Sequence, residues 1–542
     1  MTGFSRRGAC PALSAPMSTG DGLLVRLNPL AGEIAPNVLI GLCESAARHG
    51  NGIVEVTARG SIQIRGLTAE SARLLAEEVD ALGIAVRTGV PVDTSPLAGI
   101  DPEETADPTP LAAAIRTAIA EVDLATRLGP KVSIVVDGRG QVGLGTIIGD
   151  VRLVAKDAER WRLSVAGDEN SARLVGEFDP DAACAATLDI LRAIAALGRQ
   201  GRARDLSSEV VRAAIAGFEA SHSLAPPSVL PDISPARGEI GNSAGGARHA
   251  ALPMDGDGDD SLISPLPRKV GSAAGGADRA ALQMGGDGGD SLISPLAGEM
   301  SGRTEGGGKD RDAAKAAALE PESIPEHSAA TDSSAIGTLS LSGTQIALGI
   351  ALPFGSIEAA ALIAFCRAAA AAGATCIRPA PGRTLLVMGL DRASAANLTA
   401  AASSLGFVMS PNDPSIRIAA CPGAPACASG MIAARDVAAE IAHEIGESLD
   451  PTLSLHVSGC AKGCAHPGPA TLTIVGDEKG AVFVVGGTAR GLPAAYTAGY
   501  EAARGMGRLT KLLAQERKPD EDAAACLARL GAKRLAQALA QE

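Results

Sequence analysis

Four cysteines in the C-terminal part of the chain have the residue type and spacing of iron-sulfur ligands. Cys421 and Cys427 form a C-x5-C pair, and Cys460 and Cys464 form a C-x3-C pair after 32 intervening residues. Both pairs lie in segments rich in Gly, Pro and Ala, where the backbone can turn tightly. A [4Fe-4S] cube needs thiolates from such loops and backbone N–H groups near its sulfur atoms. The pattern therefore predicts a [4Fe-4S] site.

Two other interpretations of these cysteines stay open, namely a zinc or redox-dithiol site and buried, inert thiols. Structural zinc sites usually use C-x2-C or C-x4-C pairs, so spacings of five and three residues favour the cluster. The other cysteines are scattered singly, and we expect them to be small apolar core residues: Cys10, Cys43, Cys184, Cys366, Cys376 and Cys526.

A helix and short strands are expected to position the cysteines. Residues 428–448 have helical periodicity, and residues 453–457 indicate a strand that leads to Cys460. Residues 471–476 and 481–487 predict a hairpin. His456 and His466 flank the second pair, and each is either a metal ligand or an ordinary structural histidine.

The composition limits the class of protein. A chain of 542 residues predicts three or four domains. A net charge of −13 argues against a nucleic-acid partner, which would require a basic stripe. The sequence has neither an apolar run long enough to span a membrane nor an apolar signal core, so we expect a cytoplasmic protein with no membrane partner. Thiols stay reduced in that compartment and can serve metals.

The same succession of elements occurs twice, on either side of a segment at residues 224–332 that we expect to be a disordered linker. This linker is rich in Gly, Ser, Pro and Asp, and residues 234–263 are repeated at 264–293. The order of elements is strand, helix, strand, strand, helix, which predicts a duplicated ferredoxin-like half-domain. The first copy comprises residues 22–27, 37–49, 52–57, 61–67 and 69–82, and the second residues 345–352, 357–372, 374–378, 383–390 and 393–405.

A Gly-x-Gly-x-x-Gly sequence at residues 138–143 follows a strand expected at residues 131–136, after a helix at 111–128. In a dinucleotide site the third glycine opens a helix of about a dozen residues. Residues 144–150 are too rich in glycine and β-branched residues for such a helix. We therefore expect a hairpin turn to a strand at residues 151–154, and no NAD site.

Together, the cysteine spacing, the duplicated unit and residues 57–66 (TARGSIQIRG) resemble the nitrite and sulfite reductases, which couple sirohaem to a [4Fe-4S] cluster. The resemblance covers the chain apart from the linker and the extreme termini. Residues 21–26, 378–387 and 421–430 are most similar to one family of this superfamily, which uses O2 to hydroxylate precorrin-3A in aerobic cobalamin biosynthesis.

The resemblance implies an α+β architecture of two ferredoxin-like half-domains and two α/β domains. It also implies a non-haem iron beside the cluster, and a hydroxylation at a meso carbon with closure of a γ-lactone from an acetate side chain. An NADH-linked electron donor is expected as a partner. The expected boundaries are an N-terminal segment at 1–20, half-domains at 21–100 and 333–412, a first α/β domain at 101–223, the linker, a cluster domain at 413–510 and a helical segment at 511–542.

The cationic residues favour a large anionic substrate over sulfite or nitrite. The reductases hold their small anion with two arginines and two lysines. Here Lys131 matches the first lysine, Ser133 replaces the second, and Arg87 is displaced by about one residue from the second arginine. A pocket that lacks one or two of four charges binds a small dianion less well.

A tetrapyrrole with acetate and propionate arms would instead be paired by guanidinium and ammonium groups on its edge. The candidates are Arg59, Arg65, Lys131, Arg378 and Arg383. The residue that directs O2 is not identified by the sequence. Two other functions stay open, a sirohaem-dependent sulfite or nitrite reductase and a non-catalytic iron-sulfur or tetrapyrrole carrier.

Overall fold

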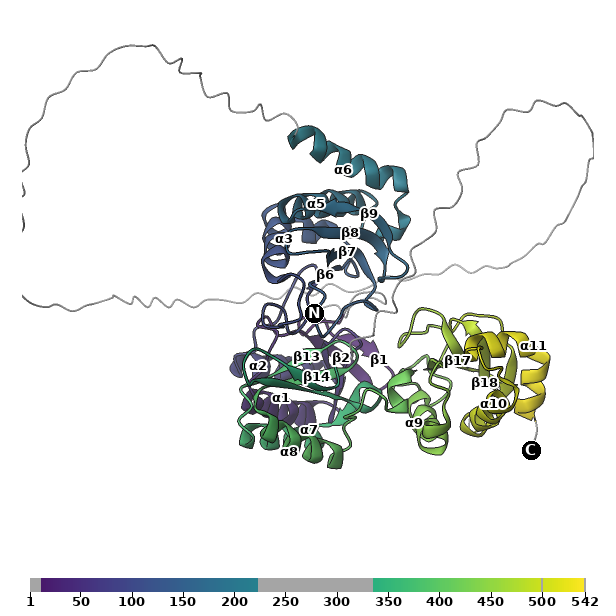
Figure 1. Ribbon diagram of the computed structural model, residues 1–542. Coiled ribbons are helices and arrows are strands. Elements are labelled where there is room, and N and C mark those ends of the chain that lie inside the picture. The colour runs from purple at the N-terminus through teal and green to yellow at the C-terminus, as the bar shows by residue number, and fades with distance from the viewer. Residues whose placement is uncertain (1–10, 223–334, 499–500, 541–542) are drawn as a thin grey trace, which may run out of the picture. The chain divides into compact units, whose positions relative to one another are not determined.

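The structure is a computed structural model that describes residues 11–222, 335–498 and 501–540. The linker expected at residues 224–332, and Cys10, lie outside the described residues. The described strands form four sheets, and helices pack against them (Figure 1). No helix in this part of the chain is long and apolar enough to cross a membrane. The architecture is α+β and duplicated, as the sequence predicts.

The first repeat unit has the expected order of elements. It comprises β1 (Met17–Thr19), β2 (Gly22–Leu27), α1 (Pro36–His49), β3 (Ile53–Val56), β4 (Ile62–Leu67) and α2 (Ala69–Ala81). Proline opens α1, where its missing N–H would have no helical partner. Thr68 caps α2 by accepting a hydrogen bond from the backbone N–H of Ser71. The helices cover one face of a sheet with strand order β1-β2-β4-β3-β12.

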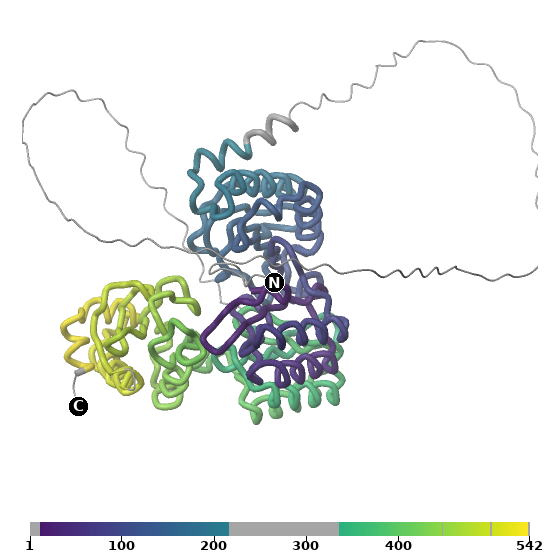
Figure 2. Tube along the Cα trace, turned by 180° about the vertical axis from the view of Figure 1, so that it is seen from behind, coloured from purple at the N-terminus to yellow at the C-terminus, as the bar shows by residue number. Residues whose placement is uncertain are grey.

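The second unit repeats this arrangement with a sheet ordered β10-β11-β14-β13. Its elements are β10 (Gly337–Ser340), β11 (Ile346–Ala351), α7 (Ala359–Ala371), β13 (Cys376–Ala380), β14 (Thr384–Leu390) and α8 (Arg392–Ser404). The apolar residues of both units form one continuous core, in which α1 packs against α7 (Figure 2). The two half-domains therefore bury their helices against each other.

Each unit also contributes backbone to the other unit's sheet. The segment before α7, β12 (Ser356–Glu358), pairs antiparallel with β3 of the first unit. Reciprocally, Ile34, which precedes α1, forms a bridge with Ile377 of β13. The helix expected from residue 357 therefore begins only at Ala359, because the residues before it are taken up by the neighbouring sheet.

A third sheet has the strand order β5-β6-β7-β8-β9. Its strands are β5 (Val92–Asp93), β6 (Ile134–Asp137), β7 (Gly149–Ala155), β8 (Trp161–Gly167) and β9 (Arg173–Phe178), and its helices are α3 (Thr109–Glu121), α4 (Leu124–Arg127), α5 (Pro180–Ala196) and α6 (Ser208–His222). Helices α3 and α5 pack against each other and contribute to the core of this sheet. The expected strand at residues 131–136 starts later, at Ile134, which leaves Lys131 in the preceding turn.

The predicted hairpin at the glycine-rich segment is wrong, because β6 and β7 run parallel. The intervening residues 138–148 form a loop without a helix. The carboxylate of Asp137 holds the loop by accepting hydrogen bonds from the backbone N–H groups of Arg139 at 3.0 Å and Leu144 at 3.1 Å. The buried Arg152 donates to the carbonyls of Leu144 and Ile147. A turn-rich composition specifies the loop but not the direction of the strand that follows it.

Glu104, which lies beside this loop, should make the folding stability of the protein depend on pH. Burial raises the pKa of Glu104 from 4.5 to about 7, helped by neighbouring carboxylates and opposed by the N–H of Gly99. The folded chain therefore binds more protons than the unfolded chain between these values, so stability should fall as pH rises from 4.5 to about 7. Glu104→Gln should flatten this dependence and raise the melting temperature at pH 8 relative to the parent. Equal melting temperatures of parent and variant at pH 8 would contradict this expectation.

The fourth sheet carries the cysteines and has the order β15-β16-β17-β18-β19. Its strands are β15 (Ile418–Ala420), β16 (Leu455–Ser458), β17 (Ala470–Asp477), β18 (Gly480–Gly487) and β19 (Ala495–Thr497), with α9 (Ala434–Ile445), α10 (Ala502–Glu516) and α11 (Ala523–Ala540) around its core. The predicted hairpin of β17 and β18 is confirmed. The helix expected at 428–448 is shorter, since residues 428–433 remain in the cysteine loop.

Candidate iron-sulfur and substrate site

The cysteine loops leave neighbouring strands at the same edge of the fourth sheet. Cys421 follows β15 directly, and Cys460 comes two residues after β16. Because β15 and β16 are parallel, their carboxyl ends lie together. Chain segments that are far apart in the sequence therefore bring their first cysteines to one place.

Backbone contacts hold the two loops together. The N–H of Gly459 points to the Cys421 sulfur at 3.1 Å, and the N–H of Met431 donates to the Gly459 carbonyl at 2.7 Å. A methyl group on Gly459 would lie 2.8 Å from the Cα of Gly423, so only glycine allows this approach. Small residues between the cysteines thus serve the close packing that a cluster requires.

The four thiols influence one another electrostatically. Burial raises the pKa of the Cys464 thiol, and the nearby Cys421, Cys460 and Cys427 raise it further. Within the described residues, however, no group of three or more Cys, His, Asp or Glu side chains could hold a single metal ion as they lie. Each thiolate of a cube binds a different iron, so cluster ligands stand farther apart than ligands of one ion. The assignment of the four cysteines to a cluster therefore stays a prediction.

Arg65 connects the first half-domain to the first cysteine loop. Its side chain, only 3% exposed, extends from β4 and donates to the carbonyl of Ala426 at 2.5 Å. Its Nε and Nη2 also donate to Asp21 at 2.7 and 3.0 Å. Nη1 lies 3.4 Å from the buried carboxylate of Glu55. Arg65 thus holds the backbone between two predicted cluster ligands.

Glu55 and Gly20 complete this connection. The Glu55 carboxylate also pairs with Arg435 of α9 at 2.5 Å, so it links β3 to the helix behind the cysteine loop. The turn at Gly20 lies so close to the same loop that a methyl group there would be 2.7 Å from the Pro425 carbonyl. We call Asp21, Glu55, Arg65 and Arg435 the docking network.

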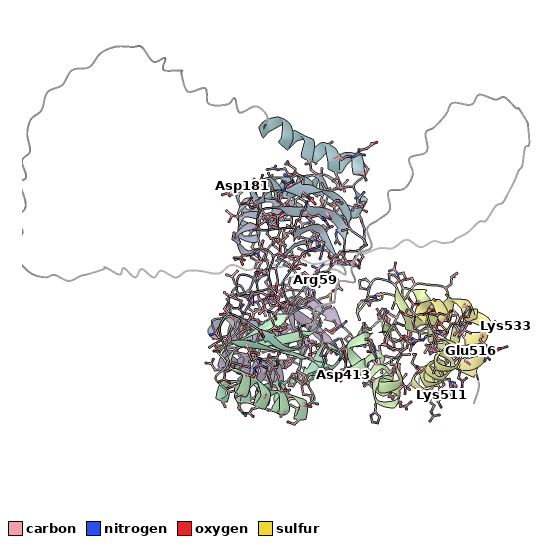
Figure 3. The ribbon with its side chains drawn as sticks, viewed as in Figure 1. Arg59, Asp181, Asp413, Lys511, Glu516 and Lys533 are labelled. Atoms are coloured by element: carbon pink, nitrogen blue, oxygen red, sulfur yellow. The ribbon has the colours of Figure 1, made fainter. Side chains whose placement is uncertain are left out.

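Arg59 lies at the junction of the two repeat units. The turns between their central strands are joined by a hydrogen bond from the Gly382 N–H to the Ala58 carbonyl at 3.0 Å. From this junction Arg59, which is labelled in Figure 3, reaches Asp93 at 2.9 Å and also donates to the Ile148 carbonyl. Burial raises the pKa of Asp93, against the charges of Arg59, Arg87 and Arg116. Asp93 therefore pairs with Arg59 and lies within electrostatic reach of two further arginines.

The other predicted substrate-binding residues differ in their surroundings. Lys131 is exposed in the turn before β6. Arg378, on β13, donates to Glu33 at 2.8 and 3.0 Å and to the Pro96 carbonyl at 2.8 Å. Ser133, at the position of the second lysine of the reductases, is buried and its N–H donates to Asp150.

Arg383 reaches the second cysteine loop from the other half-domain. It has a left-handed backbone with φ of 65° and donates to the Ala465 carbonyl at 3.2 Å. Burial and the neighbouring Arg435 lower the pKa of Arg383. The two histidines lie beside it, with ring centroids 5.8 Å apart. His456 is fully buried, whereas His466 is partly exposed and bonds the Pro469 carbonyl at 3.1 Å.

Sequence reasoning missed the carboxylates that organise these cations and two of the cations themselves. Glu55 could have been suspected, because it is a charged residue in the apolar strand Ile53–Val56. Arg116 and Arg435 gave no signal, since a charged residue on an amphipathic helix is ordinarily a solvated one. Their role depends on contacts between elements that are distant in the sequence.

The comparisons with known proteins agree on the superfamily. The family model described as nitrite/sulfite reductase ferredoxin-like half domain matches residues 15–82. A curated protein from Sinorhizobium sp. named precorrin-3B synthase is 34% identical over 539 residues, covering 99% of this chain and 95% of that protein. The solved structure of Mycobacterium tuberculosis NirA has a TM-score of 0.62 at 16% identity, over 95% of this chain and 84% of that chain. At that identity, the likeness to NirA concerns the fold.

Proposed function

From the premise that this chain belongs to the precorrin-3B synthase family, within the nitrite/sulfite reductase superfamily, we propose how its residues serve that family's reaction. The observation that carries the assignment is the 34% identity to a precorrin-3B synthase over nearly the full length of both chains. The chain is accordingly an oxidoreductase, a monooxygenase that acts on precorrin-3A with O2.

The reaction defines what the protein must bind. One oxygen atom enters the tetrapyrrole as a hydroxyl group at a meso carbon, and an acetate side chain closes a γ-lactone. The other oxygen atom leaves as water and consumes two electrons and two protons. We propose an NADH-linked protein as the electron source, because the chain has no dinucleotide-binding helix after its glycine-rich segment among the described residues.

Cys421, Cys427, Cys460 and Cys464 are the proposed ligands of a [4Fe-4S] cluster, the cofactor that this superfamily generally combines with sirohaem. When bound, a cluster supplies electrons one at a time. The N–H of Gly459 near the Cys421 sulfur, and the Arg65 bond to Ala426, support this assignment. A non-haem iron is a further proposed cofactor, and sirohaem belongs to the alternative function as a sulfite or nitrite reductase.

The proposed substrate-binding residues are the five cations predicted from the sequence. Arg59 and Lys131 are the strongest of them, because Arg59 is 38% exposed at a junction where two further arginines act electrostatically on Asp93, and Lys131 is exposed and has no salt bridge among the described residues. Arg378 donates to the Pro96 carbonyl and pairs with one carboxylate, that of Glu33. Arg383 donates to the Ala465 carbonyl. For Arg65, the contacts with Asp21, Glu55 and Ala426 support a role in holding the cysteine loop beside any role in binding.

Arg59→Ala and Lys131→Ala should each weaken binding of precorrin-3A about ten- to a hundredfold. A charge-assisted hydrogen bond contributes roughly 1.5 to 3 kcal/mol, which corresponds to that loss. The iron-sulfur spectrum should stay unchanged, since neither residue touches a cysteine loop. Binding can be measured by absorbance titration under argon. Lys533→Ala, an exposed cation on α11, is the control; parental affinity in both test variants would place the substrate elsewhere.

The function itself is tested with anaerobically purified protein, precorrin-3A, a chemical reductant and ¹⁸O-labelled O2. We expect a tetrapyrrole product that has gained labelled oxygen, and an absorption spectrum with a broad iron-sulfur shoulder and no sirohaem bands. Strong sirohaem bands with turnover of sulfite or nitrite would instead establish the reductase. A bound tetrapyrrole that never reacts would indicate a carrier.

A further inference from the structure

His456 of β16 is a fully buried polar side chain. It has no exposed surface, and neither Nδ1 nor Nε2 bonds any group among the described residues. A buried imidazole without partners is unfavourable by the desolvation of its polar atoms, about 1 to 3 kcal/mol. Such a group points to a partner that the described residues do not provide.

The strand places this histidine under the second cysteine loop. Leu455 and Val457 of β16 face the apolar core shared with α9 and α10, so alternation puts His456 on the opposite face of the sheet. On that face a methyl group at Gly463, between Cys460 and Cys464, would lie 3.6 Å from Cε1 of His456. The imidazole therefore lies directly against the backbone of the loop that carries two predicted cluster ligands.

The charges around His456 are complementary to a cluster. Its described electrostatic neighbours are His466 and the half-buried Arg383, and both lower the pKa of His456 in addition to burial, which lowers it most. The only described hydrogen bond of the Arg383 side chain is the one to Ala465, and no carboxylate is among the groups that shift the pKa of Arg383. A [4Fe-4S] cube with four thiolates carries net negative charge, which hydrogen bonds and nearby cations stabilise in the reduced form.

We infer that His456 donates an N–H hydrogen bond to the iron-sulfur unit held by Cys460 and Cys464, and that this bond raises the reduction potential of the cluster. The inference rests on the proposed assignment of the four cysteines to a [4Fe-4S] cluster. It gives His456 the role of a positioning and tuning residue rather than that of a metal ligand.

The test is the midpoint potential of the cluster in the full chain, measured by EPR-monitored titration without substrate. In His456→Leu the reduction equilibrium should become roughly tenfold less favourable, a shift of about 59 mV to more negative potential for one electron. His456→Asn and His456→Gln keep a donor near the position of Nδ1 or Nε2, and at least one should restore part of the shift. His443→Leu, at an exposed position on α9, should keep the parental potential.

A measurement on the parent protein does not depend on how the variants fold. With ¹⁵N-histidine incorporated, pulsed EPR of the reduced cluster should show hyperfine coupling to one histidine nitrogen. A parent protein that binds no iron and sulfide would remove the proposed cluster assignment. A parent protein that holds the cluster but lacks this coupling would overturn the role of His456 and leave the cluster assignment intact. A cluster-containing His456→Leu protein with the parental potential would do the same. So would a His456→Leu protein whose only defect is weaker binding of precorrin-3A.

Discussion

Cys421→Ser should leave the purified protein without its iron-sulfur absorbance and without turnover of precorrin-3A. An alkoxide or hydroxyl oxygen is a harder ligand than a thiolate and binds the iron of a cluster poorly. The same result is expected for Cys427, Cys460 and Cys464, because each would hold a different iron atom. Iron and acid-labile sulfide, measured per polypeptide after anaerobic purification, give the direct readout.

Cys184→Ser is the control for this experiment. Cys184 is half-buried on α5 in the third sheet's domain, far in sequence from the cysteine loops. This variant should retain parental iron, sulfide and activity. A Cys421→Ser protein with a full complement of iron and sulfide would show that the cluster has other ligands, and the assignment of all four cysteines would then have to be revised.

Arg65→Ala should cost about 3 to 5 kcal/mol of stability and should also release the first cysteine loop. Removing Arg65 leaves the Asp21 carboxylate without its cation and leaves the buried Glu55 carboxylate with Arg435 alone, which is strongly unfavourable. The loop simultaneously loses its bond to the Ala426 carbonyl. We expect a lower urea midpoint for the cluster-free protein and faster loss of the cluster in air for the loaded protein.

Two further variants separate docking from a general loss of charge. Arg73→Ala breaks an exposed pair on α2, whose partners are 62% and 59% exposed, and should change stability by only about 0.3 to 0.5 kcal/mol. Combining Arg65→Ala with Glu55→Gln should cost less than the sum of the single changes, because both single changes break the same Arg65–Glu55 pair, which the double variant loses only once. Additive losses, together with a cluster as stable as the parent's, would show that the docking network does not hold the loop.

Secondary structure in the repeat units was predictable because its signals are local. Alternating apolar residues in Ile62–Leu67 and the helical pattern of Ala69–Ala81 each specify an element without help from the rest of the chain. The secondary-structure predictions were wrong where contacts between segments distant in the sequence determine the structure. Residues 356–358 became a strand because β3 offers them a partner, and the loop after β6 returned in parallel because Asp137 and Arg152 organise its backbone.

The residues of the candidate site likewise differ in whether local sequence is enough to predict their role. Cysteine spacing depends on the chain near each pair, so the four thiols could be found from the sequence. Whether a cation is available to a substrate depends on its neighbours in space. Arg65 and Arg59 stand six residues apart in one motif, yet Arg65 is 3% exposed within the docking network and Arg59 is 38% exposed at the turn junction. No local pattern distinguishes them.

The exchange of backbone between the repeat units has a consequence for how the chain can reach its folded state. During synthesis, the first unit emerges with the edge of β3 unpaired, and it must wait for β12, some three hundred residues later, to cover that edge. An exposed strand edge is a template for pairing with other chains. Because each half-domain's sheet is extended by backbone from the other half-domain, we expect either half-domain on its own to expose a strand edge and to associate with other chains.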